Sequence, residues 1–245
     1  MIKAVVFDLD DTLISEKEYV LSGFKVVSKE IAKQYKLDNK EVLKKMNELF
    51  NESSKNVFNR VLDFYNIQYS NNEILYLINI YRNHEPDINF FDDVIPTIKE
   101  LKKNGIKIGM ITDGYKETQL RKIEALKCRE LFDEIIITDE LGREFWKPHE
   151  RAYMMMAEKL NINFSNMIYI GDNITKDFKG ANNLGVVTIK VNRDNGVYGN
   201  IDVEKEFHPR YMINNIRCIS NWVNENAAIR KMEDIDEENF ICNYT

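Results

Sequence analysis

The sequence predicts an α/β fold built on a parallel sheet, with a small helical bundle inserted near the N-terminus. Short apolar runs rich in β-branched residues alternate with amphipathic segments from about residue 87 onward. A block of amphipathic segments without a strand-like run separates the first apolar run from the others. The 245 residues, 44% of them hydrophobic, are enough for one large domain with a smaller inserted one.

The first apolar run and the block that follows it make up the N-terminal third of the chain. Residues 2–7, IKAVVF, are short, apolar and β-branched, which is typical of a buried strand. In residues 16–36, Val20, Phe24 and Ile31 recur at helical spacing. Three further segments repeat this periodicity: residues 39–50, 55–66 and 71–83. Four helices joined by short polar links indicate a small helical bundle.

From residue 87 onward, helix and strand alternate. Gly105 and Gly185 end the first and last of four predicted helices, and Pro148 lies in the first turn of another. A weaker pattern in residues 210–223 adds a strand and a helix. The four helices are predicted at 92–105, 115–127, 148–160 and 175–185, and the strands at 106–111, 133–138, 166–170 and 186–191. This alternation predicts a Rossmann-like parallel sheet with helices on both faces.

These patterns divide the chain into two domains and a tail. Residues 1–14 and 87–225 are predicted to form the α/β core domain, and residues 15–86 a helical domain inserted into it. Residues 226–245 include the acidic stretch KMEDIDEEN and are expected to form a solvated C-terminal tail.

Net charge, cysteine spacing and hydropathy narrow the cellular locations and the kinds of partner that we expect for this protein. A net charge of -6 argues against nucleic acid or an anionic membrane surface as the main partner, but not against a small anionic ligand. The cysteines Cys128, Cys218 and Cys242 show no paired spacing, which is typical of reduced thiols rather than of a disulfide framework. The sequence contains neither a signal peptide pattern nor an apolar stretch long enough to span a bilayer. We therefore expect a cytoplasmic protein.

Polar residues follow the predicted strands at the points where the strands end. Ligands of open parallel sheets bind outside the carboxyl ends of the strands, so we expect these side chains to meet in one crevice. The residues are Asp8 and Asp10, then Thr112, Asp113 and Gly114, then Lys147, and finally Asp172, Asn173 and Asp177.

Four of the carboxylates in this set, those of Asp8, Asp10, Asp172 and Asp177, predict a cation. Asp8 and Asp10 are two apart in an extended segment, so their side chains project to the same side. Asp172 and Asp177 would add two more negative charges, an unfavourable arrangement unless a cation is present or protons are taken up. An all-oxygen site without nearby Cys or His suits Mg²⁺. Lys147 supplies a second positive charge, and the pocket suits a dianionic group such as phosphate.

The order of these motifs resembles the haloacid dehalogenase-like hydrolase superfamily. The matching stretches are DLDDT from Asp8, ITDG ending at Gly114, KP at Lys147, and GDNITKD ending at Asp177. The helical block between the first two motifs resembles the cap that one branch of this superfamily inserts after its first strand. The resemblance implies a phosphatase, and residues 111–140 look most like members that act on acylneuraminate phosphates, nucleoside monophosphates or other sugar phosphates.

The resemblance also implies catalytic roles for individual residues. Asp8 would be the nucleophile that accepts the phosphoryl group, and Asp10 the acid and base for the leaving group and the attacking water. Thr112 and Lys147 would contact the phosphoryl group, and Lys147 would also offset the charge of Asp8. Asp172 would hold Mg²⁺ together with the Asp8 carboxylate and the Asp10 carbonyl oxygen.

Four further positions have supporting roles in the same resemblance. Asp113 and Gly114 would lie in the phosphate-binding loop, where many relatives carry Asn in place of Asp113. Asp177 would orient Lys147 or a metal-bound water, and Asn173 would lie beside it. An Asp113 side chain that pointed inward could lower phosphate affinity or touch the substrate.

Three alternative functions stay open at this point. A phosphomutase of the same superfamily would transfer phosphate within one sugar instead of releasing it. A dehalogenase also uses an aspartate nucleophile, but that branch lacks the counterpart of Asp10 and needs no metal. A non-catalytic binding module would keep the fold, although the complete residue set argues against it.

Overall fold

The computed structural model describes residues 1–193 and 203–226 and divides the chain into two compact units. One unit comprises Met1–Ser15, Asn89–Gln119 and Leu126–Thr245, and the other comprises Glu16–Ile88 and Leu120–Ala125. We call them the α/β unit and the helical unit. Of the predicted C-terminal tail, residues 227–245 lie outside the described part of the chain.

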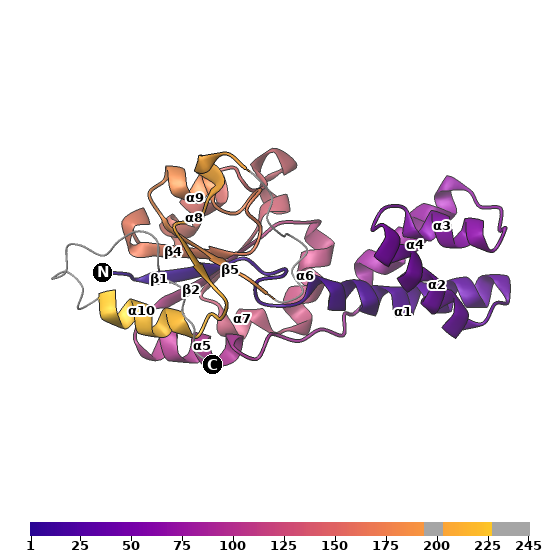
Figure 1. Ribbon diagram of the computed structural model, residues 1–245, viewed down its shortest axis with the longest axis horizontal. Coiled ribbons are helices and arrows are strands. Elements are labelled where there is room, and N and C mark those ends of the chain that lie inside the picture. The colour runs from indigo at the N-terminus through magenta and orange to yellow at the C-terminus, as the bar shows by residue number, and fades with distance from the viewer. Residues whose placement is uncertain (194–202, 227–245) are drawn as a thin grey trace. The chain divides into compact units, whose positions relative to one another are not determined.

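A six-stranded sheet forms the centre of the α/β unit (Figure 1). Every neighbouring pair of strands is parallel, and the order across the sheet is β3-β2-β1-β4-β5-β6. The strands are β1 (Ala4–Phe7), β2 (Lys107–Thr112), β3 (Glu134–Ile137), β4 (Met167–Gly171), β5 (Val187–Val191) and β6 (Tyr211–Ile213). The apolar runs predicted this parallel sheet, and the prediction is confirmed.

Helices cover both faces of the sheet. Helices α8 and α9 pack on one face and α5 and α10 on the other (Figure 1). The helices of this unit are α5 (Val94–Lys103), α7 (Cys128–Leu131), α8 (Arg151–Lys159), α9 (Lys179–Asn183) and α10 (Cys218–Asn226), with α6 (Lys116–Ala125) shared with the helical unit. Short 3-10 helices are η1 (Thr138–Leu141), η2 (Arg143–Phe145), η3 (Phe164–Asn166) and η4 (Lys205–Phe207). The layered α/β fold class predicted from the sequence is therefore confirmed.

One predicted helix is shorter in the structure than in the sequence analysis. The pattern predicted a helix over residues 175–185, but α9 covers only Lys179–Asn183. The backbone N–H of Asn173 donates to the Asp177 carboxylate at 2.8 Å, and Asn173 Oδ1 accepts from the Thr175 backbone N–H. These side-chain bonds satisfy the backbone in a turn, which competes with helix formation.

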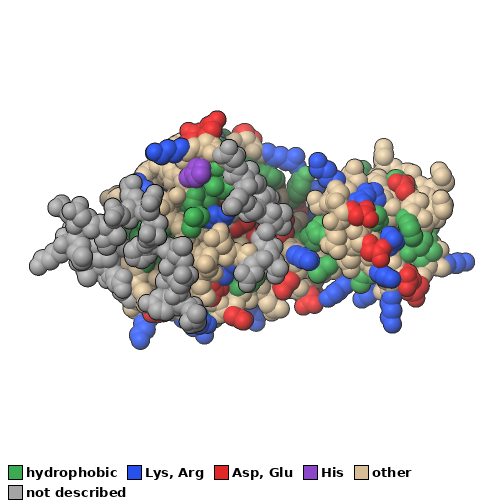
Figure 2. Space-filling model, viewed as in Figure 1, with side chains coloured by type: hydrophobic (Ala, Val, Ile, Leu, Met, Phe, Trp, Pro, Cys, Tyr) green, Lys and Arg blue, Asp and Glu red, His purple; other side chains and the backbone are tan. Residues whose placement is uncertain are grey.

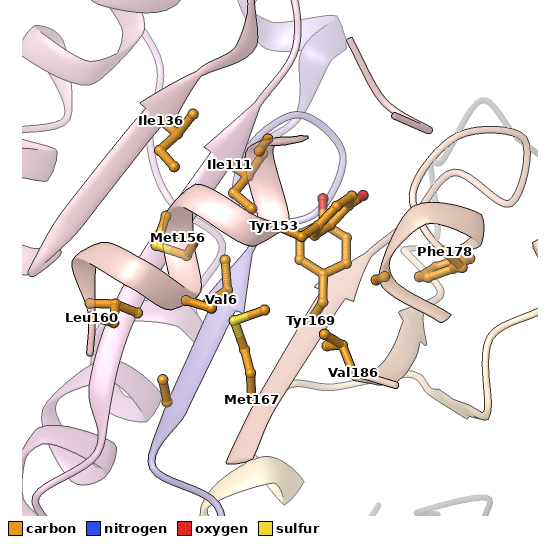
Figure 3. Packing of buried hydrophobic residues seen from close by; sticks show 14 residues of the cluster. Val6, Ile111, Ile136, Tyr153, Met156, Leu160, Met167, Tyr169, Phe178 and Val186 are labelled. Atoms are coloured by element: carbon orange, nitrogen blue, oxygen red, sulfur yellow. The ribbon is translucent and has the colours of Figure 1, made fainter. Parts of the chain in front are cut away.

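One hydrophobic core of the α/β unit joins residues of α8 to residues of β1, β2, β3 and β4. Tyr153 of α8 and Tyr169 of β4 are fully buried, with ring centroids 4.9 Å apart in an edge-on arrangement (Figure 3). Gly109 of β2 gives Met156 room, because a Cβ at this position would lie 2.7 Å from the Met156 sulfur. The close packing of α8 on the sheet holds both tyrosine hydroxyls at fixed positions.

The helical unit contains the four predicted helices of the N-terminal block. They are α1 (Glu16–Tyr35), α2 (Asn39–Glu52), α3 (Val57–Phe64) and α4 (Asn71–Asn83). Asp38 caps α2, and Ser70 with Glu73 forms a capping box at α4, which satisfies the free N–H groups of these helix starts. Acidic and basic side chains are interspersed on the face of this unit that Figure 2 shows.

Residues 120–125 differ from the predicted domain division, which placed them in the α/β core. The structure groups them with the helical unit. The buried Lys122 places its ammonium group 4.3 Å from the centre of the Tyr19 ring in α1. This cation–π contact joins the second half of α6 to α1.

No helix in residues 1–193 and 203–226 has the length and apolar character needed to cross a membrane.

Candidate active site

The site lies where the strand order of the sheet reverses. Strand β1 is flanked by β2 on one side and β4 on the other, and the loops that follow β1, β2 and β4 surround the end of β1. The Asp8 backbone N–H donates to the Ile170 carbonyl oxygen at 2.8 Å, so Asp8 continues the strand pairing by one residue. Such a reversal leaves a crevice at the carboxyl edge of the sheet.

A buried ion-pair cluster occupies this edge. Lys147 Nζ lies 2.6 Å from Asp8 Oδ1 and 2.7 Å from Asp177 Oδ1. The side chains of Lys147 and Asp177 are fully buried and that of Asp8 is 3% exposed. Burial lowers the pKa of Lys147, but the Asp177 and Asp8 charges outweigh it and hold that pKa well above its usual value. Lys147 is therefore a fixed cation between two carboxylates.

Asp177 is held from several directions. The Tyr169 hydroxyl lies 3.3 Å from Asp177 Oδ1, the same oxygen that accepts from Lys147. The Asn173 backbone N–H donates to Oδ2, and the Tyr153 hydroxyl donates to the Asp177 carbonyl oxygen at 2.7 Å. A Cβ at position 171 would lie 2.5 Å from Asp177 Oδ2, so the motif glycine makes room for this carboxylate.

Burial and the Lys147 charge act in opposite directions on the pKa of Asp177. Burial raises this pKa, but the ammonium groups of Lys147 and Lys176 outweigh burial and lower it below the usual range of a carboxyl group. With both carboxylate oxygens hydrogen-bonded, Asp177 is a charged anchor for Lys147.

Asp172 completes a group of three buried carboxylates. Ligand oxygens of Asp8, Asp172 and Asp177 all lie within 4.8 Å of one another. The Thr12 hydroxyl lies 3.4 Å from Asp172 Oδ1. Burial, followed by the charges of Asp177 and Asp8, raises the pKa of Asp172 to about 9. Burial also raises the pKa of Asp8 to about 7, although Lys147 opposes this rise.

The raised pKa values of Asp8 and Asp172 show that the neighbouring lysines, Lys147 and Lys176, do not neutralise this group of carboxylates. Without a further positive charge, Asp172 takes up a proton near neutral pH. The donors are all oxygen atoms, which fits a hard divalent cation. The three residues could therefore hold a metal ion, in agreement with the cation predicted from the sequence.

Asp10 and Thr112 are linked by a residue that the sequence analysis missed. Gln119 Nε2 donates to Asp10 Oδ2 at 3.2 Å and to the Asp113 carbonyl oxygen at 3.0 Å. The Thr112 hydroxyl donates to Gln119 Oε1 at 3.0 Å. Helix α6 begins at Lys116, two residues after the end of the ITDG motif, and so brings Gln119 back over the motif.

The Asp113 side chain is engaged by its own loop neighbours. Its Oδ1 accepts from the Thr138 hydroxyl at 2.6 Å and from the Lys147 backbone N–H at 3.3 Å. Lys176 forms an ion pair with Oδ2 at 3.7 Å. The carboxylate thus ties the ITDG loop to the loop that carries Lys147.

Other contributing residues were also outside the sequence prediction. They are Thr12, Thr138, Tyr153, Tyr169 and Lys176. The two tyrosines belong to apolar elements whose pattern indicates core packing, and Thr138 is the last residue of the apolar run predicted as a strand. Thr12 and Lys176 lie within the DLDDT and GDNITKD motifs, so their place in these motifs was the available signal.

The parallel sheet carries buried carboxylates and a lysine at the carboxyl end of its central strand. The protein is therefore an α/β protein with an acidic site where the strand order reverses. Residues 5–191 match the family described as haloacid dehalogenase-like hydrolase. The chain belongs to this family, and it is a hydrolase of that class.

Similar proteins come from archaea and bacteria. A glyceraldehyde 3-phosphate phosphatase of Methanocaldococcus jannaschii is 29% identical over 222 residues, which cover 89% of this chain and 95% of that protein. The pyrophosphatase PpaX of Bacillus mycoides is 28% identical over 196 residues, covering 78% and 83% of the two chains. The crystal structure of the hydrolase YfnB of Bacillus subtilis has a TM-score of 0.65 at 20% identity and covers 91% of this chain and 99% of that one.

Proposed function

We propose that this protein is a Mg²⁺-dependent phosphatase that hydrolyses a small phosphorylated metabolite through a phosphorylated Asp8. One observation carries the proposal: Lys147 bridges the buried Asp8 and Asp177, and Asp172 lies within 4.8 Å of both carboxylates. This arrangement places a carboxylate nucleophile beside a positive charge that can offset the negative charge of a phosphoryl group. Phosphoryl transfer depends on such positioning and charge neutralisation.

The first chemical step forms a bond between an Asp8 carboxylate oxygen and phosphorus. The bond from phosphorus to the ester oxygen breaks, and Asp10 gives its proton to the departing oxygen, because an alkoxide is a poor leaving group. Lys147 offsets the negative charge of both partners. The Thr112 hydroxyl and the backbone N–H groups of Asp113 and Gly114 would bind the phosphoryl oxygens.

The second step returns Asp8 to its starting state. Asp10, now a carboxylate, takes a proton from water as the water oxygen attacks phosphorus. The bond between phosphorus and the Asp8 oxygen breaks, and inorganic phosphate leaves. Asp10 ends the cycle protonated again, so no further reactant is needed.

The residues that would hold Mg²⁺ are the Asp8 and Asp172 carboxylates and the Asp10 carbonyl oxygen. Both oxygens of Asp177 already accept hydrogen bonds, which favours an orienting role for Asp177 and Asn173 over direct ligation. When bound, Mg²⁺ would screen the approach of an anionic nucleophile to an anionic ester.

The relatives and the composition support the substrate class and the setting. The two similar proteins named above are a phosphatase of glyceraldehyde 3-phosphate and a pyrophosphatase, and both names describe small phosphorylated compounds. The net charge of -6 supports a small ligand rather than nucleic acid or a membrane surface as partner. Cys128 and Cys218 are free thiols, which supports a cytoplasmic location. Residues 15–86 would act as the cap that selects the substrate.

A panel of phosphomonoesters, scored by release of inorganic phosphate, tests the proposal. We expect hydrolysis of at least one sugar, triose or nucleoside phosphate with MgCl₂ present, and none with EDTA. Transfer of phosphate between two carbons of one sugar, without release, would instead identify a phosphomutase. Halide release from a haloacid with EDTA present would identify a dehalogenase, and no reaction with any compound would favour a binding module.

The raised pKa values predict that the effect of Mg²⁺ on stability grows with pH. In the metal-free fold the pKa of Asp8 is about 7 and that of Asp172 about 9, so the folded chain holds protons that the unfolded chain has released. The stability that these protons contribute is complete below the usual carboxyl pKa of 3.8 and is lost as pH rises through about 7 and then about 9. Metal and protons compete for the same oxygens.

We therefore expect the increase in Tm caused by millimolar MgCl₂ to be larger near pH 8 than near pH 6. Thermal unfolding at both pH values, with MgCl₂ or EDTA, measures it. The control Asp172→Asn should remove most of the increase at both pH values. An increase in Tm that is independent of pH in the unmodified protein would contradict the prediction.

A further inference from the structure

Gln119 uses every polar atom of its buried side chain on the two motif loops of the site. It is 2% exposed. Its amide nitrogen donates to Asp10 and to the Asp113 carbonyl oxygen, and its amide oxygen accepts from the Thr112 hydroxyl. One neutral side chain therefore connects the loop after β1 to the loop after β2.

The glycine of the ITDG motif matches this arrangement. Gly114 has a φ of +129°, a region that residues with a side chain rarely adopt. A Cβ at this position would lie 2.6 Å from Gln119 Nε2. The missing side chain at 114 thus gives the amide of Gln119 room to reach both loops.

The loop after β2 is also anchored by contacts that do not involve Gln119. The Thr138 hydroxyl lies 3.3 Å from the Thr112 carbonyl oxygen and donates to Asp113 Oδ1 at 2.6 Å. Because this loop is held by Thr138, the residue that follows β3, Gln119 can transmit the position of the loop to the Asp10 carboxylate. An amide orients a carboxylate by donating to it and adds no charge of its own.

We propose that Gln119 is a positioning residue that aims the Asp10 carboxylate at the leaving-group oxygen while it holds the Thr112 hydroxyl. The inference rests on the proposed phosphatase function, since it assigns Asp10 the transfer of the proton. A carboxyl group that is free to rotate spends less time in the geometry needed for proton transfer, and misplacement by about 1 Å can lower a rate by about 10²-fold.

The test compares esters whose leaving groups need a proton with esters whose leaving groups do not. An alkyl phosphate leaves as a poor alkoxide and depends on the acid, whereas 4-nitrophenyl phosphate leaves as a stable phenolate. We expect Gln119→Met to lower kcat/KM for the alkyl ester by about 10- to 100-fold. For 4-nitrophenyl phosphate, kcat/KM should fall much less, because it reports the steps up to loss of the phenolate, in which only the contact to Thr112 is missing.

The second chemical step provides another readout on the same variant. Asp10 must also activate water, so release of phosphate from Asp8 should slow in Gln119→Met with either ester. Stopped-flow measurements with 4-nitrophenyl phosphate should then show a larger burst of phenolate, followed by a slower steady rate. If Gln119 had a merely structural role, its substitution would lower kcat/KM for both esters by the same factor and would produce no burst.

Gln119→Glu separates the two halves of the contact. The carboxylate keeps an oxygen that accepts from Thr112 but has no N–H to donate to Asp10. We expect it to show the same selective loss on the alkyl ester as Gln119→Met. Native kinetics in Gln119→Glu, or an equal loss of kcat/KM for the two esters in Gln119→Met, would overturn the inference.

A matched control comes from another glutamine on a helix. Gln34 of α1 hydrogen-bonds Tyr35 and Glu73 within the helical unit, and Gln34→Met should hydrolyse both esters at native rates.

Assays of the unmodified protein distinguish failure of the proposed phosphatase function from failure of the inference about Gln119. If it releases phosphate from neither ester, nor from any in the panel, the proposed function and the inference both fail. An active protein with unselective Gln119 variants overturns the inference alone.

If Gln119→Met does not fold, the contact between Gln119 and Asp10 can be tested by NMR without changing Gln119. The chain has three glutamines, Gln34, Gln68 and Gln119, so ¹⁵N-glutamine labelling produces three side-chain amide signals in an NMR spectrum. The Gln119 amide protons should exchange slowly with water, and Asp10→Asn should shift the Gln119 signal but not the other two. An unchanged Gln119 signal in Asp10→Asn would show that the contact does not form, which overturns the inference.

Discussion

Asp8→Asn should abolish turnover and leave the fold intact. The amide cannot act as the nucleophile, and removal of an attacking group typically lowers a rate by about 10⁴-fold or more. The substitution keeps the shape of the side chain at the end of β1, where the backbone N–H of residue 8 bonds Ile170. Phosphate release and circular dichroism measure the two expectations.

Trapping of the phosphorylated enzyme strengthens this test. Acid quenching with a ³²P-labelled ester should leave label on the native protein and none on Asp8→Asn. Asp63→Asn, at an exposed position of α3, is the matched control and should keep native activity and native labelling. Near-native turnover in Asp8→Asn would show that another group attacks phosphorus.

Lys147→Ala should lower both activity and stability. The ammonium group offsets charge on the phosphoryl group, and loss of one such contact lowers transition-state stabilisation by about 2–4 kcal/mol. The substitution also leaves Asp8 and Asp177 buried without their shared cation. Breaking a buried pair in this way typically destabilises a fold by about 3–5 kcal/mol. Steady-state kinetics and urea unfolding in EDTA measure the two effects.

An exposed ion pair provides the control for the stability effect. Lys159 pairs with Glu134 at 3.2 Å with 46% of its side chain exposed, so Lys159→Ala should change the unfolding free energy by at most about 1 kcal/mol. Adding Asp177→Asn to Lys147→Ala removes one of the two stranded charges and should recover part of the lost stability. Equal unfolding free energies for the native protein and Lys147→Ala would show that the lysine is not the buried bridge described above.

The parts of the fold that were predictable are those with a local signature. The runs AVVF, KIGMIT and MIYIG are apolar because both faces of a parallel sheet are covered, so periodicity and composition reveal them. Helix boundaries were less accurate. The segment before α9 reads as helical, but Asn173 and Asp177 satisfy the backbone in a turn, and a side-chain bond of this kind leaves no periodic trace.

The site was predictable to the extent that its residues sit at strand ends. The distances among Asp8, Asp172 and Asp177 follow from the pairing of β1 with β4, which brings distant stretches of sequence to one edge. Gln119 was not predictable in this way, because a glutamine in an amphipathic helix is common on a solvated face. Only the fold shows that it is buried against Asp10 and Thr112.

The sequence by itself determined the class of fold, the order of the motifs, and the excess of carboxylates that calls for a cation. The tertiary structure alone decided which oxygen each donor contacts, that Asp113 turns to Thr138 and Lys176, and that Lys147 lies between Asp8 and Asp177. The physical reason is that strand and helix formation depends on neighbours along the chain. A buried charge, in contrast, is positioned by whichever partners the folded chain brings within hydrogen-bonding distance.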